Sequence, residues 1–270
     1  MRSASRSGAA GRFEAVKLPP LLAFALLAKV AAVALWLAGA KSWLVAAFFF
    51  GPDPFVLYAL FVPSAQGLGR VFTRFATDRR ELWLTIDDGP DPDDTPKILD
   101  LLDRHGAKVT FFVIGERAAR WPELVREIVR RGHEIGHHTH THPARSFWCA
   151  SPRRLNAELD LALGKLSEIG VRPRWFRAPV GIKNLILSPA LAARDLQCVG
   201  WTIRSGDCRS RSPAALVAAN TERLRPGAIV LLHEGPSVPA AVRVAGIAQL
   251  LDAIAEQEFV CIIPPADRLR

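Results

Sequence analysis

Acidic and histidine side chains gather at two places in the sequence where they could bind a metal ion. Asp87 and Asp88 follow the apolar run ELWLTI at 81–86, and five of the seven histidines lie within residues 133–142. Two imidazoles and one carboxylate form a metal site that leaves positions open for water and substrate. Consecutive side chains diverge, so one aspartate could bind the metal while its neighbour faces a water on that metal. The alternative for the two aspartates alone is a turn with a helix-capping acid.

The spacing of the histidines leaves open which of them act together. His138 and His142 are four residues apart, so one helical turn or a tight loop presents both imidazoles on one side. In an extended segment, His138, His140 and His142 would share a face instead. With Asp88, such a pair gives a two-histidine, one-carboxylate site, and the pattern therefore predicts a metal site with positions open for water and substrate.

Two further strand ends carry polar groups that could take part in the chemistry. The segment RAPVG at 177–181 follows a strand-like run that begins near Arg174, and His233 ends the apolar run AIVLLH at 228–233. In parallel α/β folds the working residues lie where strands end and loops begin. We therefore expect Arg177 and His233 to meet the aspartates at one edge of a sheet.

The elements that must position these residues alternate along the chain from Glu81 onward. Apolar runs typical of buried strands occupy 81–86, 108–114, 133–136, 174–179, 196–201, 228–233 and 259–263. Helix starts are indicated by a hydroxyl residue before a proline at 95–96, 151–152, 188–189 and 212–213, and by a proline at 122. A stripe of leucines at helical spacing, from Leu155 to Leu166, predicts core packing. The alternation predicts a parallel α/β sheet, open or closed into a barrel.

In their order along the chain, four motifs resemble those of the NodB-homology polysaccharide deacetylases, which are carbohydrate esterase family 4. The motifs are TIDDGPD at 85–91, HTHTHP at 138–143, RAPVG at 177–181 and LLH at 231–233. The resemblance covers residues 81–265. It implies a distorted (β/α) barrel of about seven parallel strands and an enzyme that hydrolyses the N-acetyl group of a sugar.

The resemblance also implies roles for four residues that would move protons. Asp87 matches the catalytic base, and Arg177 matches the arginine that pairs with this base and holds it ionised. His233 matches the general acid, which Asp207 would orient.

Three other residues match the metal ligands of the family: Asp88, His138 and His142. This donor set implies a divalent metal, with Zn2+ as the default and Co2+ or Ni2+ also fitting. Neither His137 nor His140 matches a residue with a role in the family.

Contacts to the substrate are implied for the remaining motif residues, which are Pro179, Val180, Gly181 and Leu232. A backbone N–H at Val180 would bind the oxyanion, and Leu232 would flank the acetyl methyl. The chain departs from the family at Arg204 and Cys208, which stand where an aspartate and a tryptophan are usual. Since the tryptophan walls the acyl pocket, this departure leaves the acyl preference open.

A membrane anchor is predicted ahead of this domain. Residues 21–40 contain one charge, Lys29, and about 20 apolar residues suffice to span a bilayer. A second apolar stretch, 43–62, is interrupted by Gly51-Pro52-Asp53-Pro54, so any helix there must be kinked or broken. We expect a basic tail at 1–20, a helical hairpin as the anchor at 21–63, a basic linker at 64–80 and the catalytic domain at 81–265. One span with a second, non-spanning element is the alternative.

The distribution of charge bears on partners and location. Of the net charge of +9, residues 1–80 carry +7 and residues 81–270 only +2, which argues against a nucleic-acid partner for the main domain. Four basic residues precede the first apolar stretch and four follow the second, with only Lys41 between them. This pattern predicts a bacterial-type inner-membrane protein with its domain in the cytoplasm, or in the periplasm if there is only one span. The four cysteines are too widely spaced for a metal knuckle or a disulfide framework.

These observations predict a membrane-anchored, metal-dependent N-deacetylase. Its expected partners are membrane lipid and an N-acetylated sugar in a lipid-linked glycan, a glycolipid or an envelope polysaccharide. An N-deformylase of a lipid-linked amino sugar is the alternative with the same machinery. A catalytically inactive glycan-binding membrane protein is the alternative from a different class.

Overall fold

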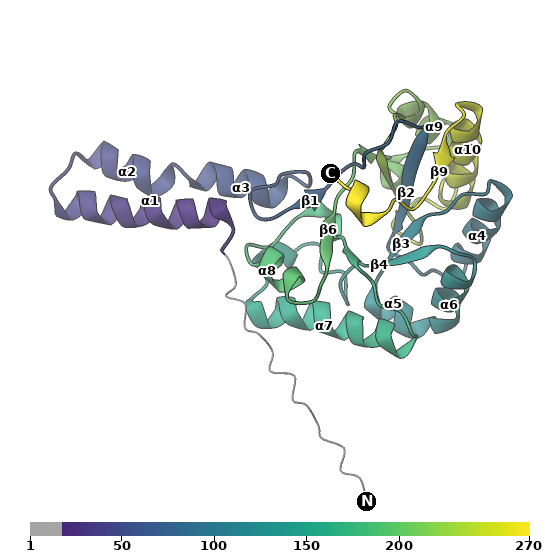
Figure 1. The fold of residues 1–270 in the computed structure, drawn as a ribbon, viewed down its shortest axis with the longest axis horizontal. Coiled ribbons are helices and arrows are strands. Elements are labelled where there is room, and N and C mark those ends of the chain that lie inside the picture. The colour runs from purple at the N-terminus through teal and green to yellow at the C-terminus, as the bar shows by residue number, and fades with distance from the viewer. Residues whose placement is uncertain (1–17) are drawn as a thin grey trace, which may run out of the picture.

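An apolar helical hairpin precedes a curled sheet that is covered by helices in the computed structural model (Figure 1). The model describes residues 18–270, so residues 1–17 of the expected basic tail lie outside the described part. In the hairpin, helix α1 (Pro20–Leu37) packs against α2 (Ser42–Phe50) and α3 (Asp53–Phe61). The break between α2 and α3 falls at Gly51 and Pro52, as expected for a residue without an amide donor.

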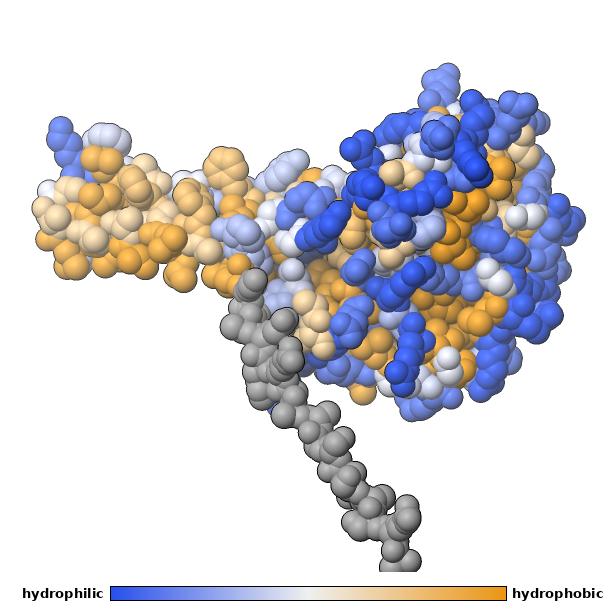
Figure 2. All heavy atoms as spheres, viewed as in Figure 1, coloured by the Kyte–Doolittle hydropathy of each residue, from blue (hydrophilic) through white to orange (hydrophobic). Residues whose placement is uncertain are grey.

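The surface of this hairpin is unlike that of the domain. Figure 2 shows a largely apolar hairpin surface beside a domain whose visible face is mostly polar. The spans Pro20–Leu37 and Ser42–Phe61 are long and apolar enough to cross a membrane. Lys29 of α1 is paired within the hairpin, because its Nζ donates to Phe49 O at 2.7 Å and to Asp53 Oδ1 at 2.8 Å.

Within residues 18–270, nine strands form the sheet, and all of its strand pairs are parallel. The main path runs in the order β1 (Val71–Phe72), β6 (Gln197–Val199), β5 (Trp175–Phe176), β4 (Glu134–His137), β3 (Thr110–Val113), β2 (Glu81–Asp87), β8 (Ile229–His233) and β7 (Ile203–Arg204). Strand β9 (Val260–Cys261) pairs with the start of β2. The seven expected strands are all present. The two additional strands, β1 and β7, have two residues each, which is too short to show a period in the sequence.

The sheet curls toward closure, which confirms the expected distorted barrel. Isolated bridges join Arg74 to Ala228 and Phe75 to Leu269, so the chain after β1 reaches the β8 side and the C-terminus. Part of the 64–80 segment that was expected to be a linker is therefore strand β1 of the sheet.

Helices cover the outside of the curled sheet (Figure 1). They are α4 (Thr95–Arg104), α5 (Gly115–Arg120), α6 (Pro122–Arg130), α7 (Pro152–Glu168), α8 (Leu187–Ala192), α9 (Pro213–Thr221) and α10 (Arg243–Glu256). Two predicted caps are formed, since Ser151 Oγ accepts from Arg154 N and Ser212 Oγ from Ala215 N. Ser188, by contrast, lies inside α8 rather than before it.

Strand alternation separates two cores. Leu84 of β2 and Leu232 of β8 belong to the large cluster under the helices. Trp83 and Ile229 lie on the opposite face of these strands. They belong to a second cluster, with Phe112, inside the curl of the sheet. Because side chains alternate along a strand, the last residues of β2 and β8 have their side chains on this same inner face.

Candidate active site

The predicted catalytic residues converge at the carboxyl edge of the sheet. Asp87 ends β2 and His233 ends β8, and the two are partners in the parallel register of these strands. His138 directly follows β4, and Arg177 directly follows β5. Four segments far apart in the sequence thus bring their polar residues to one place, as the strand ends predicted.

The carboxylate of Asp87 is buried and paired with a cation. Arg177 Nη1 donates to Asp87 Oδ1 at 2.7 Å and to Thr85 Oγ1 at 2.8 Å. The guanidinium also donates to Val199 O and Gly200 O, so it is held from several sides. Because both side chains are almost fully buried, this ion pair is shielded from solvent and fixed in position.

Asp88, His138 and His142 form a cluster beside this pair. Asp88 Oδ1 lies 3.5 Å from His138 Nε2 and 3.5 Å from His142 Nε2. The atom Asp88 Oδ1 is buried without a hydrogen-bond partner. Asp88 and His142 both have positive φ, at 72° and 53°, a strained backbone that is typical of functional sites.

The donor set of this cluster fits a divalent metal ion. Ligands about 2.0–2.1 Å from a tetrahedral ion lie roughly 3.4 Å apart, which matches the two measured separations. His138 Nδ1 is hydrogen-bonded to Arg177 O at 2.9 Å, and this partner leaves Nε2 free to face Asp88. An unpartnered carboxylate oxygen between two imidazole nitrogens is what a bound cation would satisfy. Asp88, His138 and His142 are therefore the residues that could hold a metal.

Burial and neighbouring charges shift the pKa values of the residues in this cluster. Burial alone would raise the pKa of Asp88, but the nearby imidazoles, that of His138 above all, hold it well below its ordinary value. Burial, aided by the charge of His138, lowers the pKa of His142 to about 4. At neutral pH Asp88 is thus ionised and His142 neutral, which are the forms that bind metals.

The histidine loop is held by a glutamate that the sequence reading did not single out. Glu158 of α7 accepts from the backbone N–H groups of His140 and Thr141, both at 2.9 Å, and from Thr141 Oγ1 at 2.6 Å. The side chain is buried next to Leu159, within the leucine stripe. In the sequence, this glutamate is a single carboxylate on an otherwise apolar helix face, a pattern that indicates a buried polar contact.

The remaining histidines of the cluster stay outside the site. His137 is fully buried, with Nε2 on Leu159 O and Nδ1 accepting from Thr139 N. His133 lies just before β4 and packs against Phe111 of β3. His138 and His142 meet through a tight loop rather than through an extended strand, so the extended alternative with His140 is not adopted.

His233 and Asp207 form a second hydrogen-bonded pair. His233 Nδ1 lies 2.9 Å from Asp207 Oδ1, and His233 N donates to Asp207 Oδ2 at 2.6 Å. Burial alone would lower the pKa of His233, but its hydrogen bonds to Asp207 and Cys208 and the carboxylate charges raise the pKa well above 6.5. His233 therefore carries a proton at neutral pH and presents Nε2 away from Asp207.

The RAPVG segment forms a short turn at the rim of the site. Pro179, Val180 and Gly181 make one 3-10 turn, with Val180 at φ 49° and its side chain exposed. Gly181 has φ 75°, and a Cβ there would lie 2.4 Å from the Trp201 ring and 2.7 Å from Pro63. Pro63 follows the helical hairpin almost directly, so the end of the hairpin borders this turn.

One expected substrate contact is not supported by its position. Leu232 is fully buried in the core under the helices, on the face of β8 opposite to His233. It is therefore directed away from the catalytic groups and does not line the site. Leu231, two residues before His233, lies on the same face of β8 as His233. The two-residue period of a strand therefore favours Leu231 over Leu232 as a residue that faces the site.

Two contacts to Asp88 come from segments to which the sequence reading gave no role. Ser237 Oγ donates to Asp88 Oδ2 at 2.9 Å, and Arg117 Nη1 donates to Asp88 O at 2.7 Å. Neither residue lies in a motif, and Ser237 is 149 positions from its partner. These contacts fix both the carboxylate and the backbone of Asp88.

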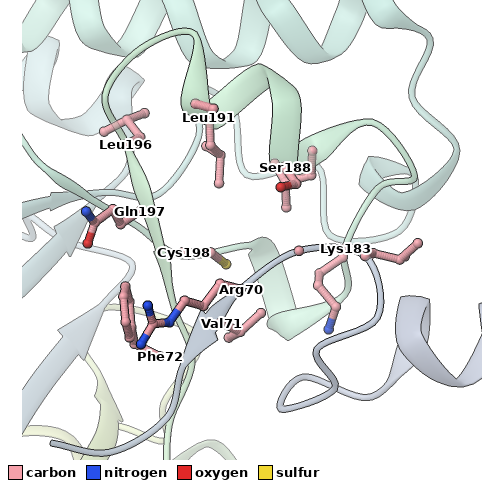
Figure 3. A pocket seen from close by; sticks show the side chains of 13 residues that line it. Arg70, Val71, Phe72, Lys183, Ser188, Leu191, Leu196, Gln197 and Cys198 are labelled. Carbon is pink, nitrogen blue, oxygen red and sulfur yellow. The ribbon is translucent and has the colours of Figure 1, made fainter. Parts of the chain in front are cut away.

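A cavity of about 230 Å3 lies away from these residues, between α8 and strands β1 and β6 (Figure 3). Leu191 and Leu196 line one side of it, and Arg70 and Phe72 line the other. Lys183, also at this cavity, donates from Nζ to Val62 O and from its backbone N–H to Leu60 O. The end of the hairpin is thereby tied to the domain beside the cavity.

Comparison with known proteins agrees with the family that the motifs indicate. The family model described as polysaccharide deacetylase matches residues 75–199. A chitooligosaccharide deacetylase from Bradyrhizobium sp. (strain ANU 289) is 39% identical over 158 residues, which are 58% of this chain and 71% of the relative. A peptidoglycan-N-acetylglucosamine deacetylase from Bacillus cereus is 32% identical over 195 residues, which are 71% of this chain and 89% of the relative.

The fold is also shared with a solved enzyme. The structure of a family 4 carbohydrate esterase from Streptomyces lividans, in complex with acetate, is similar with a TM-score of 0.62 and 29% identity. The similarity covers 70% of this chain and 95% of that one. The chain belongs to the polysaccharide deacetylase family, carbohydrate esterase family 4, and the predicted class of carbohydrate N-deacetylase is confirmed.

Proposed function

We propose that this protein is a metal-dependent N-deacetylase that acts on an N-acetylglucosamine-type sugar within a glycan at a membrane surface. The observation that carries the proposal is the convergence of three groups at the sheet edge. These groups are the Asp87–Arg177 ion pair, the Asp88–His138–His142 cluster, and the Asp207–His233 pair. The chitooligosaccharide and peptidoglycan deacetylases to which the chain is similar support this substrate class.

The metal proposed for the cluster of Asp88, His138 and His142 is Zn2+, with Co2+ or Ni2+ as functional substitutes. Two imidazoles and one carboxylate are a common zinc donor set that leaves a position open. When bound, the ion would polarise the amide carbonyl and lower the pKa of a water.

Asp87 is the proposed general base. Its Oδ1 is occupied by Arg177, while Oδ2 lies 3.8 Å from His138 Nε2 and so faces the metal ligands. A water placed between Oδ2 and the substrate carbonyl would lose its proton to Asp87 as it attacks. Arg177 balances the negative charge of Asp87 throughout.

His233 is the proposed general acid, on the opposite side of the reacting carbon. Its protonated ring can donate from Nε2 to the amine as the C–N bond breaks, and an amine needs this proton to leave. Asp207 holds the ring through Nδ1. The backbone N–H of Val180 is the proposed donor to the oxyanion, at the turn that borders the site.

We further propose that the hairpin of α1 to α3 inserts into the inner membrane and holds the domain on the cytoplasmic side. Two antiparallel spans return the chain to its starting side, and the basic residues flanking them favour the cytoplasm. Gly181 contacts Pro63, and the Phe61 ring lies 5.6 Å from that of Trp148, so the hairpin ends beside the site. This placement favours a lipid-linked glycan, a glycolipid or another membrane-proximal polysaccharide as substrate.

A single assay tests the activity. Detergent-purified full-length protein is incubated with N-acetylated and N-formylated lipid-linked sugars, with and without a chelator. The masses of the products are then measured by mass spectrometry. The expected result is loss of an acetyl group that chelation blocks and Zn2+ restores. Loss of formyl alone would identify a deformylase, and binding of both sugars without turnover would identify an inactive glycan-binding protein; either result overturns the proposal.

A further inference from the structure

A second group of potential metal ligands lies at the base of His233. One ligand atom each from Asp207, Cys208 and His233 lies within 4.8 Å of the others, as in the cluster at Asp88. In residues 18–270, which include all four cysteines, this is the only such group with a thiol. Its cysteine is also one of the two residues, with Arg204, that stand where the family has other residues.

The three residues are held together by their backbone as well as by their side chains. Asp207 Oδ1 accepts from Cys208 N and faces His233 Nδ1, both at 2.9 Å. Asp207 is almost fully buried, while Cys208 and His233 are partly exposed. Cys208 and His233 are thus the two members of the group that solvent reaches, with the carboxylate fixed behind them.

We propose that Asp207, Cys208 and His233 form a second zinc site, weaker than the first, whose occupation inhibits the enzyme. Thiolate, imidazole and carboxylate are all zinc ligands, and water would complete the coordination. The inhibitory effect rests on the proposed role of His233 as general acid. A ring that binds zinc through Nδ1 is no longer an imidazolium, and its remaining Nε2–H is too weak an acid to protonate the leaving amine. Cys208 thereby makes the enzyme sensitive to excess zinc.

Proton balance explains why this site is the weaker one. Zinc binding here must release one proton from the His233 ring and one from the Cys208 thiol, with no change in oxidation state. It must also replace the existing hydrogen bond between His233 and Asp207. The cluster at Asp88 requires neither change, because Asp88 Oδ1 has no hydrogen-bond partner.

Cobalt substitution tests the site without any assay of activity. Thiolate ligation to Co2+ gives a near-ultraviolet charge-transfer band, and the ligands Asp88, His138 and His142 contain no sulfur. With Co2+ added beyond one equivalent, the full-length protein should show this band. Cys208→Ser and Cys208→Ala should lack it, while Cys149→Ser, which alters an exposed cysteine elsewhere, should keep it.

Metal stoichiometry and inhibition complete the test. Equilibrium dialysis against buffered Zn2+ should give two ions per chain, and Cys208→Ser should weaken the second by at least ~10-fold while keeping the first. The zinc concentration that half-inhibits hydrolysis should rise by the same factor in that variant. Absence of the band in the wild type, or its survival in both Cys208 variants, would overturn the site. A normal band without zinc inhibition would leave the site standing and refute the role given to His233.

Discussion

Asp87 and His233 lie side by side at the sheet edge because they are register partners on the neighbouring parallel strands β2 and β8. Partner residues on adjacent strands project to the same side of a sheet, so both side chains reach the same site. Arg177 neutralises the first and Asp207 the second, at 2.7 and 2.9 Å. The fold thereby brings a carboxylate and a protonated imidazole to the same side of the sheet edge.

The alkaline limit of activity should follow the proton on His233. Because the pKa of His233 is raised well above 6.5, the acid is protonated below that raised value and lost as pH rises through it. Asp207→Asn removes the charge that raises this pKa, so the alkaline limb of kcat should move to lower pH. A pH–rate profile of both proteins measures the shift.

Its control is Asp93→Asn, an exposed carboxylate on the loop after β2, whose profile should match the wild type. In addition, His233→Ala should lower kcat by about 100- to 10,000-fold, the range for a lost general acid. An unmoved alkaline limb in Asp207→Asn would mean that another group supplies the proton.

Substitution of Asp87 should separate catalysis from metal binding. Asp87→Asn keeps the shape of the side chain but removes the base, so kcat/KM should fall by about 100- to 10,000-fold. Metal content, measured by elemental analysis after dialysis, should stay near that of the wild type. Loss of metal in Asp87→Asn with retention in Asp88→Asn would show that the roles of the two aspartates are exchanged.

Ser237 should act on the metal site through Asp88 alone. Its hydroxyl holds Asp88 Oδ2 at 2.9 Å and leaves Oδ1 toward the two imidazoles. Ser237→Ala should therefore weaken metal binding by roughly 10- to 100-fold, the usual effect of losing an outer hydrogen bond to a ligand. Competition with a chromophoric chelator measures this affinity.

The conservative variant Ser237→Thr, which keeps the hydroxyl, should restore most of the affinity. Equal affinities for the alanine variant and the wild type would show that Asp88 is oriented without Ser237, through the contact of Arg117 with its backbone.

Site residues could be predicted from the sequence where their position depends on the strand or loop that contains them. Asp87 and His233 end long apolar strands, and the tight loop from His138 to His142 is encoded within five residues. Strands β1 and β7 were missed because two residues show no periodicity. For Leu232, the two-residue period of β8 was available and already contradicted the expected contact.

Contacts between segments far apart in the chain could not be predicted from the sequence. Glu158 reaches the histidine loop from α7, and Ser237 reaches Asp88 from the loop after β8. Both depend on how helices and loops pack over the sheet edge, so a single sequence does not show which distant groups these side chains contact. The break at Pro52 was predictable, but the partner of Lys29 was not.

The ion pair between Lys29 and Asp53 should determine how well the hairpin holds together. Lys29 Nζ satisfies Asp53 and the Phe49 carbonyl at the break between α2 and α3, so replacing one partner leaves the other charge unpaired among apolar side chains. Lys29→Leu and Asp53→Leu should each destabilise the hairpin, whereas the double variant should recover. We expect a coupling free energy of about 1–2 kcal/mol, as for polar contacts between membrane helices.

Thermal unfolding of the four proteins in lipid nanodiscs, followed by helical circular dichroism, closes this double-mutant cycle. Lys41→Leu, which removes a charge from the turn between α1 and α2, is the matched control for loss of a lysine and should leave the unfolding temperature unchanged. Additive effects of the two substitutions would mean that each charge is solvated separately. In that case the break would lie in the headgroup region, and the hairpin would rest in the interface rather than span the bilayer.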